Sequence, residues 1–391
     1  MRIGIDARFY GSVGKGLGRY TEKLIEYLEV VDTENEYVIF LRQENFDAYQ
    51  PKNKLFRKVL AQYQWYGFAE QLLYPLQLYR LHLDLMHFPH FNVPIFYRKK
   101  FIVTIHDLIL VHYPTLRNTT LGTTAYRIKF MVYRFVIARA IRCAEAIITV
   151  SHFTEADILK HYPRARGKIS VTYEAADAAC PILANEEKIS LFRRLGIAES
   201  TQGETTAGMA RDILKPYLLY VGNAYPHKNL EALIKVAMEL PEYLFVLVGK
   251  EDYFYARLKR EAKVQGAKNV IFAGYLTDRE LGALYRHGSL YIFPSLYEGF
   301  GLPPLEAMTH GLPVLSSSCG SLPEILGDAA FYFNPRLSVG LPDVIRSLMG
   351  NKEQREHLRM KGYSQAARYQ FKEMVVATHA LYMHTFENKE E

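Results

Sequence analysis

Short apolar runs alternate with helical patterns along this chain, and the alternation begins twice. In the first half the runs are four to six residues long, rich in β-branched or aromatic side chains and bounded by polar residues or proline, which predicts strands. Strands separated by helices favour a parallel sheet covered on both faces. The predicted strands are 2–5, 37–41, 84–88, 101–105 and 146–150, and the predicted helices include 18–27 and 125–143.

A polar stretch interrupts this pattern between about residues 175 and 215. Its low-complexity segment 199–208 predicts a mobile loop or a linker. Because 391 residues exceed one ordinary core, we expect an α/β fold of two doubly wound domains, whose ligands bind outside the carboxyl ends of the strands. The later strands are predicted at 217–221, 244–248, 270–273, 290–293 and 314–316, and the helices near 230–238, 253–265, 278–286, 304–310 and 369–386.

Two carboxylates separated by seven residues follow the predicted strand 290–293. The segment reads Glu-Gly-Phe-Gly-Leu-Pro-Pro-Leu-Glu from Glu298 to Glu306. Its glycines let the main chain pass close to a ligand, and its prolines predict the first turn of a helix whose N–H groups suit a diphosphate. Carboxylates accept from vicinal hydroxyls without donating. The alternative is two surface charges, one at a turn and one at a helix start.

This segment resembles the E-x7-E signature of the family 4 retaining glycosyltransferases, and four other segments resemble the same family in the same order. The resemblance implies the GT-B fold, in which two Rossmann-like doubly wound domains face each other across a cleft. It implies an acceptor-binding domain 1–178, a nucleotide-sugar-binding domain 179–370 and a C-terminal helix 371–391 that crosses back to the first domain. The four other segments are 104–108, 150–154, 220–230 and 310–330.

The resemblance assigns roles within the two-carboxylate segment. It implies that Glu306 holds the ribose of the nucleotide and that Glu298 contacts hydroxyls of the transferred sugar. The residues between them would complete this part of the donor site. They are Gly299, Phe300, Gly301 and Leu302.

A lysine follows the predicted strand 217–221, at the end of Gly-Asn-Ala-Tyr-Pro-His-Lys228. An ammonium there suits a pyrophosphate whose charge grows as its bond to the sugar breaks, and the resemblance implies this role for Lys228. The family commonly adds an arginine where this chain has Asn223. Either Lys228 acts alone or another cation assists it, the alternative being a solvated lysine at a helix start. The other cations considered are Arg211, Lys215 and Lys250.

Two features of the first half add to the expected site. The glycines of segment 11–18, among them Gly14, Gly16 and Gly18, could bring main-chain amides to a phosphate, although tight turns are often glycine-rich. The resemblance makes this segment a loop over the donor diphosphate. His106 ends the predicted strand 101–105, and the resemblance places it beside the transferred sugar, whereas a lone histidine is usually structural.

The turn after the predicted strand 270–273 begins another helix. Thr277 and Glu280 have the spacing of a capping box at its start. The resemblance implies that main-chain groups around Gly274 and Leu276 contact the base of the nucleotide. Such contacts would leave the identity of the base unspecified by the sequence.

The sequence has no Asp-x-Asp pair and no His or Cys spacing typical of metal ligands. We therefore expect neither a metal nor a cofactor, with protein cations stabilising the leaving diphosphate. The resemblance implies hexose transfer with retention, for which we expect a front-face route. The segment 320–324 favours GDP-mannose and surface polysaccharide assembly. The alternatives are UDP-glucose, a UDP-N-acetylhexosamine, or a catalytically silent carbohydrate-binding relative.

The positive charge lies in the first half. Residues 1–175 contain 24 Lys and Arg against 16 Asp and Glu, whereas the remainder contains 24 against 25. Between Asp107 and Glu145 there is no acidic residue, and basic and aromatic residues alternate, which favours a helix on an anionic membrane. The alternative is core aromatics with solvated charges. We expect a glycan acceptor, linked to polyprenyl diphosphate, and no nucleic-acid partner, because the latter leaves the two carboxylates unexplained.

The cysteines and the beginning of the chain predict a cellular location. Cys143, Cys180 and Cys319 are scattered, which favours a reducing compartment. The chain runs directly into its first predicted strand, so we expect no signal peptide. No apolar run reaches the roughly 18 residues that a membrane span needs. We expect a cytoplasmic protein, peripheral at the inner face of the cell membrane.

Overall fold

The computed structural model describes residues 1–11, 15–114, 123–177, 180–200, 212–337 and 340–387. It divides the chain into two compact units. Unit 1 comprises Met1–Glu174 and Tyr369–Glu391, and unit 2 comprises Ala175–Arg368. Each unit contains its own parallel sheet flanked by helices, which confirms the prediction of two Rossmann-like α/β domains.

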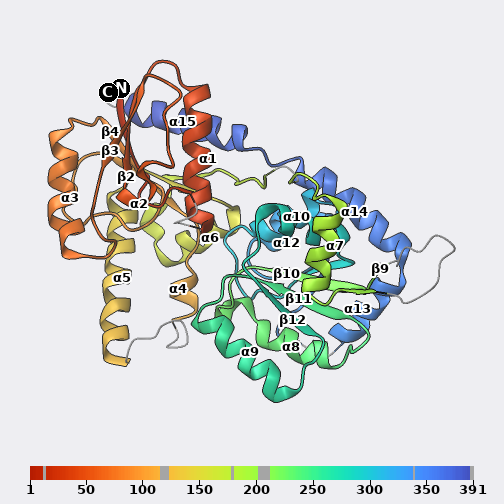
Figure 1. The fold of residues 1–391 in the computed structure, drawn as a ribbon. Coiled ribbons are helices and arrows are strands. Elements are labelled where there is room, and N and C mark those ends of the chain that lie inside the picture. Colours follow the sequence, from red (N-terminus) through yellow and green to blue (C-terminus); the bar gives the residue numbers. More distant parts are fainter. Residues whose placement is uncertain (12–14, 115–122, 178–179, 201–211, 338–339, 388–391) are drawn as a thin grey trace. The chain divides into compact units, whose positions relative to one another are not determined.

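Unit 1 is built on a seven-stranded parallel sheet with the order β3-β2-β1-β4-β5-β6-β7 (Figure 1). Successive side chains of its central strands enter two different cores, one on each face, so these strands are largely apolar, with His87 and Thr104 among the buried polar exceptions. The strands are β1 Arg2–Asp6, β2 Glu36–Leu41, β3 Phe56–Leu60, β4 Leu85–Phe88, β5 Phe101–Ile105, β6 Ala146–Thr149 and β7 Ile169–Val171.

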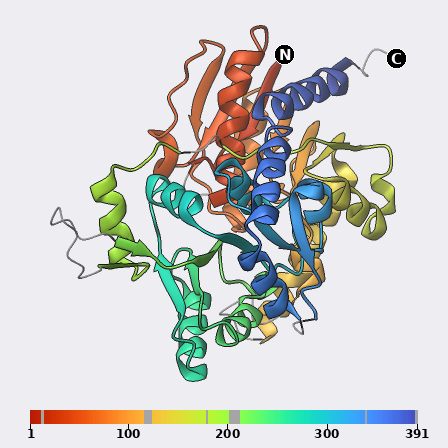
Figure 2. The same cartoon turned by 90° about the vertical axis from the view of Figure 1, so that its right-hand side faces the viewer.

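Helices cover both faces of this sheet. One core contains Leu24 of α1 and Tyr382 of α15, and these two helices lie side by side in both views (Figure 1, Figure 2). The other core contains Tyr74 of α3 and Ile137 of α5. The C-terminal helix is therefore an integral part of unit 1. The helices are α1 Lys15–Val31, α2 Gln43–Phe46, α3 Phe68–Arg80, α4 Ile109–His112, α5 Thr123–Cys143, α6 His152–His161 and α15 Phe371–Glu387.

Unit 2 is built on a six-stranded parallel sheet with the order β12-β11-β10-β13-β14-β15. The connections between its parallel strands place α8 and α9 on one face and α10 and α12 on the other (Figure 1). The strands are β10 Tyr217–Val221, β11 Leu244–Val248, β12 Val270–Gly274, β13 Leu290–Phe293, β14 Val314–Ser317 and β15 Ala330–Phe333. The helices are α7 Asn185–Arg194, α8 Leu230–Met238, α9 Tyr253–Gln265, α10 Asp278–His287, α11 Leu302–Thr309, α12 Leu322–Leu326, α13 Leu341–Gly350 and α14 Lys352–Ala366.

The structure corrects several details of the sequence prediction. The sequence analysis does not predict three strands of the parallel sheets: β3, an edge strand with charged residues, β7, which has three residues, and β15, a four-residue edge strand. The segment 199–208 does not link the units, because unit 2 begins at Ala175. Its first two residues belong to β8 (Ala198–Ser200), which pairs antiparallel with β9 (Asp212–Leu214), and 201–208 lie outside the described residues.

Candidate functional site

The centre of the unit 2 sheet brings two of the predicted motifs together. Strands β10 and β13 are neighbours in the sheet. The chain continues from β10 to β11 on one side of this pair and from β13 to β14 on the other. Their carboxyl ends therefore form the switch point at which doubly wound sheets bind ligands. The loop after β10 carries Lys228, and the loop after β13 carries Glu298.

Lys228 and Glu298 form a buried ion pair across this switch point. The lysine Nζ donates to Glu298 Oε1 at 2.5 Å, and the two residues are 9% and 7% exposed. Lys228 ends a short 3-10 turn, Pro226–Lys228, and its Nζ lies 5.4 Å from the centre of the Phe293 ring. Each charge offsets the cost of burying the other, so the ammonium is held at the carboxyl edge of the sheet.

A glycine and a serine from the following loop support the turn that carries Glu298. Gly320 has φ +66°, and a Cβ there would lie 2.7 Å from the main-chain N and O of Glu298. The hydroxyl of Ser321 donates to the carbonyl of Phe300 at 2.9 Å. The beginning of the segment 320–324 therefore packs against and hydrogen-bonds to the main chain of this turn, a role that the sequence does not reveal.

Glu306 lies on α11, which begins directly after the turn. Gly301 precedes the helix with φ +97°, a conformation that favours glycine. Glu306 is half-buried, and the hydroxyl of Tyr285 donates to its Oε2 at 3.4 Å. The Tyr285 ring is stacked on His310 with ring centres 4.9 Å apart. Tyr285 thus fixes the carboxylate against α10, a contact that sequence reasoning missed.

The end of β12 carries the residues expected near the base. Gly274 has φ +71°, and its carbonyl accepts from the N–H of Gly249 at 3.1 Å. Leu276 is buried. The predicted capping box is confirmed, because Thr277 Oγ1 accepts from Glu280 N and Glu280 Oε2 accepts from Thr277 N.

Asn223 stabilises its own loop. Its Oδ1 accepts from the N–H of Tyr225 at 3.3 Å. Of the cations considered for assisting Lys228, Lys215 precedes β10 and so lies at the opposite edge of the sheet, whereas Lys250 follows β11. Gly249 touches Gly222, because a Cβ on Gly249 would lie 2.2 Å from the Gly222 carbonyl oxygen. The topology therefore favours Lys250, and Arg211 lies outside the described residues.

In unit 1, His106 follows β5 and contacts two acceptors. Its Nδ1 lies 2.8 Å from Glu174 Oε1, and its Nε2 lies 3.0 Å from the carbonyl oxygen of Pro89. Burial alone would lower the pKa of His106, but the hydrogen bond and charge of Glu174 outweigh it and raise the pKa above 6.5. Because a carboxylate and a carbonyl only accept, the imidazolium form satisfies both contacts.

A chain of hydrogen bonds connects α15 with the residues around His106. Tyr382 Oη lies 2.6 Å from His87 Nδ1, and His87 Nε2 lies 2.8 Å from Thr104 Oγ1. Thr104 Oγ1 lies 3.2 Å from Tyr20 Oη, and the Tyr20 ring packs edge-on against His106. Burial, reinforced by repulsion from His106, lowers the pKa of His87 to about 3, so His87 is neutral.

Gly16 and Gly18 lie within α1, because this helix begins at Lys15 rather than at the predicted residue 18. A Cβ on Gly18 would lie 2.0 Å from the Gly11 carbonyl oxygen, so close main-chain packing requires a glycine there. A Cβ on Gly16 would meet nothing within 4 Å. Gly14 lies outside the described residues.

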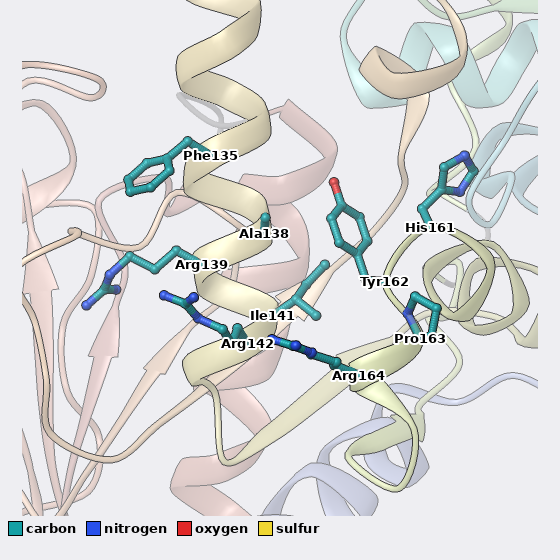
Figure 3. Close-up of a pocket in the computed structure, with 9 residues that line it drawn as sticks. All are labelled: Phe135, Ala138, Arg139, Ile141, Arg142, His161, Tyr162, Pro163 and Arg164. Carbon is teal, nitrogen blue, oxygen red and sulfur yellow. The ribbon is translucent and has the colours of Figure 1, made fainter.

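The predicted basic and aromatic helix is α5, and its aromatic residues divide between core and surface. Tyr133 is buried and Phe130 packs against the core, as the alternative interpretation expects, whereas Phe135 is 59% exposed. A hollow of about 340 Å³ lies between α5 and the residues after α6 (Figure 3). None of the helices in the described part of the chain combines the length and apolarity needed to cross a bilayer.

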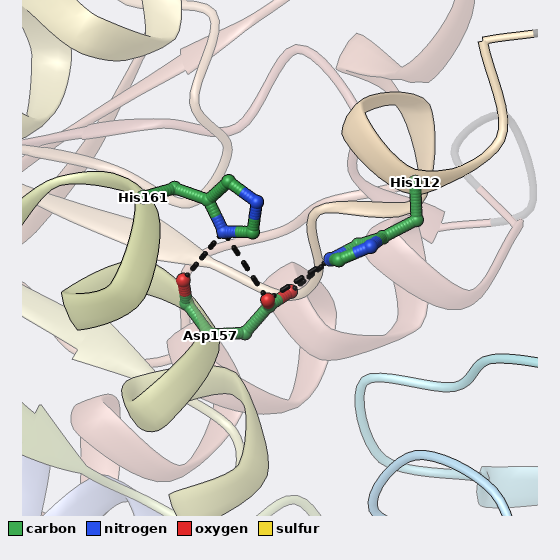
Figure 4. Close-up of side chains that lie close together, drawn as sticks. All are labelled: His112, Asp157 and His161. Atoms are coloured by element: carbon green, nitrogen blue, oxygen red, sulfur yellow. Dashed lines mark hydrogen bonds and ion pairs between the residues drawn. The ribbon is translucent and has the colours of Figure 1, made fainter.

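His112 lies close to Asp157 and His161, which are one helical turn apart on α6, although 45 positions separate it from Asp157 (Figure 4). His112 Nε2 lies 2.9 and 2.7 Å from the two carboxylate oxygens of Asp157. His161 Nδ1 lies 3.3 Å from Asp157 Oδ1 and 2.9 Å from its main-chain oxygen. Two imidazoles and a carboxylate are donors of the kind that bind zinc, which sequence spacing does not reveal. In the structure they bond to one another and join α4 to the end of α6.

Comparison with known proteins gives matches along both units. The family model described as Glycosyltransferase Family 4 matches residues 14–179, and the one described as Glycosyl transferases group 1 matches residues 210–365. O-antigen chain mannosyltransferase B of Escherichia coli is 25% identical over 387 residues, which cover 93% of this chain and 94% of that protein.

Two solved structures share the fold over nearly the whole chain. Sucrose-phosphate synthase from Thermosynechococcus elongatus aligns with a TM-score of 0.74 and 18% identity, covering 100% of both chains. Anabaena HepE, solved in complex with UDP-glucose, aligns with a TM-score of 0.69 and 15% identity, covering 98% of this chain and 99% of its own.

Proposed function

The chain belongs to the family 4 glycosyltransferases, and we propose that it transfers mannose from GDP-mannose to a hydroxyl of a lipid-linked or polysaccharide glycan. The buried pair of Lys228 and Glu298 at the switch point of the unit 2 sheet carries this proposal. It sets a cation and a hydrogen-bond acceptor side by side where a sugar and its diphosphate leaving group would meet.

Mannose is proposed as the sugar because the E. coli relative, which aligns with this chain over 94% of the relative's length, is named a mannosyltransferase. UDP-glucose is the second candidate, because HepE was solved in complex with it. We infer that Glu306 accepts from the ribose, while main-chain groups at Gly274 and Leu276 contact the base. Main-chain contacts of this kind would serve either nucleotide.

The transfer is proposed to proceed with retention and without a metal ion. As negative charge develops on the diphosphate, the ammonium of Lys228 would exchange its hydrogen bond to Glu298 for one to a phosphate oxygen. Lys250 would supply the second positive charge. Glu298 would then accept hydrogen bonds from the sugar. In the front-face route the departing phosphate oxygen takes the proton of the acceptor hydroxyl, so no side chain serves as nucleophile. The sequence supports metal independence because it has no Asp-x-Asp pair.

Thermal denaturation with a panel of nucleotide sugars in the presence of EDTA tests this assignment. GDP-mannose at about 100 times its dissociation constant should stabilise the fold by roughly 2.7 kcal/mol, and Lys228→Met should reduce the effect. If UDP-glucose alone stabilises the protein, the donor is UDP-glucose instead of GDP-mannose, and the proposed sugar transfer still holds. If no nucleotide sugar stabilises the protein, the proposed function is wrong.

We also propose that unit 1 attaches peripherally to the anionic inner face of the cell membrane. The outer side of α5 exposes four apolar side chains at helical spacing, amid basic residues. The outer side of α3 exposes four more. The exposed apolar residues are Ile128, Met131, Val132 and Phe135 on α5, and Phe68, Leu72, Leu73 and Leu76 on α3.

Flotation with liposomes measures this attachment. The protein should float with vesicles that contain phosphatidylglycerol at low salt and should be released at high salt, because screening weakens the attraction. Failure to float at low salt would contradict peripheral attachment and leave the proposed donor unaffected.

A further inference from the structure

Three arginines line one hollow beside the C-terminal half of α5. The hollow, of about 420 Å³, lies between this helix and the segment that precedes β5. Its lining residues include four cations but a single carboxylate, that of Glu145. Such an excess of positive charge is complementary to an anion. The cations are Arg98, Lys99, Arg139 and Arg142.

Arg139 is anchored at this hollow with part of its guanidinium unsatisfied. Its Nη2 donates to the carbonyl of Tyr97 at 3.0 Å. Its Nη1 is buried, and no acceptor contacts it among the described residues. Burial lowers the pKa of Arg139, and repulsion from Arg142 and Arg98 contributes to the same direction. An anion between the three arginines would relieve both the unmet donor and the repulsion.

The opposite wall of the hollow is held in place. The hydroxyl of Tyr79 on α3 donates to the carbonyl of Phe96 and accepts from the N–H of Arg98, both at 2.9 Å. The ring of Tyr79 also stacks on Tyr97. This wall therefore presents Phe96 and Arg98 from a fixed main chain, with both side chains exposed.

The helix wall continues the apolar side of α5. Phe135, Arg139 and Arg142 follow one another at helical spacing along one side of α5, and Figure 3 shows them projecting from this helix beside the hollow that Tyr162 also lines. Seven residues of helix rise about 10 Å, so the arginines end about 10 Å beyond Phe135, and the apolar residues from Ile128 to Phe135 span a similar length. An interfacial helix lies in the plane of the membrane with its apolar side inserted to roughly 5–10 Å, so long arginine side chains on that same side would reach the headgroup phosphates beside the inserted residues.

We propose that the hollow bounded by Arg98, Arg139 and Arg142 binds the phosphate of an anionic phospholipid headgroup, with Phe96 and Phe135 entering the acyl boundary beside it. This inference rests on the proposed membrane attachment and gives it a defined ligand site. Guanidinium groups suit the ligand because they donate two parallel hydrogen bonds to a phosphate.

Binding to vesicles of phosphatidylcholine and phosphatidylglycerol tests the site. Arg98→Gln and Arg142→Gln alter exposed side chains, and each should weaken binding about tenfold or more. The control is Arg134→Gln, an exposed arginine of α5 that does not line the hollow. Because this variant loses only a positive charge near the membrane surface, its vesicle binding should weaken no more than about fivefold. Equal losses in all three variants would overturn the proposal.

Soluble ligands distinguish the source of the phosphate. Dihexanoylphosphatidylglycerol below its micellar concentration should raise the melting temperature of the wild type more than that of Arg142→Gln, whereas inorganic phosphate should not. If inorganic phosphate gives the same arginine-dependent rise, the ligand is free phosphate and the lipid assignment is wrong.

Donor binding separates this inference from the proposed function. GDP-mannose should raise the melting temperature of wild type and Arg142→Gln equally, because Arg142 belongs to unit 1 and the proposed donor contacts of Lys228 and Glu306 to unit 2. Arginine-dependent vesicle binding without a response to GDP-mannose would contradict the donor and support the lipid site. The reverse result would contradict the lipid site alone.

Discussion

Each unit joins a cation to a carboxylate at the carboxyl edge of its sheet, but the two pairs differ in origin. Lys228 and Glu298 follow adjacent strands at the switch point, and both belong to segments recognisable in the sequence. His106 and Glu174 follow β5 and β7, which are separated by β6. Motifs mark both residues of the first pair. In the second pair, Glu174 belongs to no motif and reaches His106 only through the strand order of the sheet.

The pairs also differ in what pH can change. Burial and the neighbouring carboxylate set the charge of His106, whose ordinary pKa of 6.5 lies near neutrality. The unit 1 pair should therefore respond to pH, whereas the ammonium of the unit 2 pair is placed to respond to the diphosphate of a ligand.

The largest expected effect is on the unit 2 pair. Glu298→Gln should lower turnover about 10²- to 10³-fold, since the amide is a weaker acceptor for sugar hydroxyls and leaves Lys228 without its charged partner. Initial rates of sugar transfer measure this effect. Glu242→Gln, which alters an exposed surface pair with Arg346, is the control and should keep the wild-type rate. Equal rates for all three proteins would contradict the role of Glu298.

Replacing the cation of the same pair should act on binding. Lys228→Met should weaken GDP binding about 10- to 100-fold, because a charge-assisted hydrogen bond to the diphosphate contributes roughly 1.5–3 kcal/mol. Isothermal titration calorimetry measures the dissociation constant. Lys235→Met on α8 makes the same substitution at an exposed lysine away from the switch point and should leave affinity unchanged. If Lys228→Met binds GDP with the affinity of the wild type, Lys228 does not contact the diphosphate of the donor.

The support of Glu298 can be disturbed without touching its side chain. Gly320→Ala places a Cβ against the main chain of Glu298 at a φ of +66°, so the free energy of unfolding should fall by about 1–3 kcal/mol. Urea denaturation measures the loss. Gly350→Ala, where a Cβ meets nothing within 4 Å, is the matched control and should be neutral or slightly stabilising. Similar stabilities in the two variants would show that Gly320 does not hold the turn.

The smallest expected effect is on the unit 1 pair and depends on pH. Because the folded pKa of His106 is raised above 6.5, the pair stabilises the fold fully below that pH and progressively less as pH rises through the folded value. Glu174→Gln should therefore cost about 1–2 kcal/mol near pH 5.5 and little at high pH.

Denaturation across this pH range, together with an NMR titration of His106, measures the change. Glu155→Gln, whose partner His152 is exposed, should show almost no dependence on pH. A loss in Glu174→Gln that grows with pH would contradict the assignment of the imidazolium form.

Much of the fold is readable from the sequence because buried parallel strands are apolar on both faces. Strands 101–105, 217–221, 244–248 and 290–293 and helices 230–238 and 253–265 are predicted with the observed limits. Of the parallel strands that escape prediction, β3 carries charged residues and β7 has only three residues, whereas β15 is apolar but short. Glu174 is missed for the same reason: without the three-residue β7, nothing marks it as the residue beyond a strand end.

Contacts between distant segments account for the rest. Gly320 and Ser321 lie about twenty residues beyond Glu298. Gly320 packs closely against the main chain of Glu298, and the hydroxyl of Ser321 donates to main-chain carbonyls, so neither contact leaves a residue pattern to read. His112 and Asp157 are separated by 45 positions and come from two helices. Motifs thus identify Lys228 and Glu298 as separate residues, whereas their ion pair, its support and the histidine clusters require the fold.

Transfer of labelled mannose from GDP-mannose into a membrane glycan-lipid fraction, in the presence of EDTA, tests the proposed reaction most directly. The account predicts labelled product with the wild type and about 10²- to 10³-fold less with Glu298→Gln. Product formed equally by both proteins, or no product from the wild type, would contradict it.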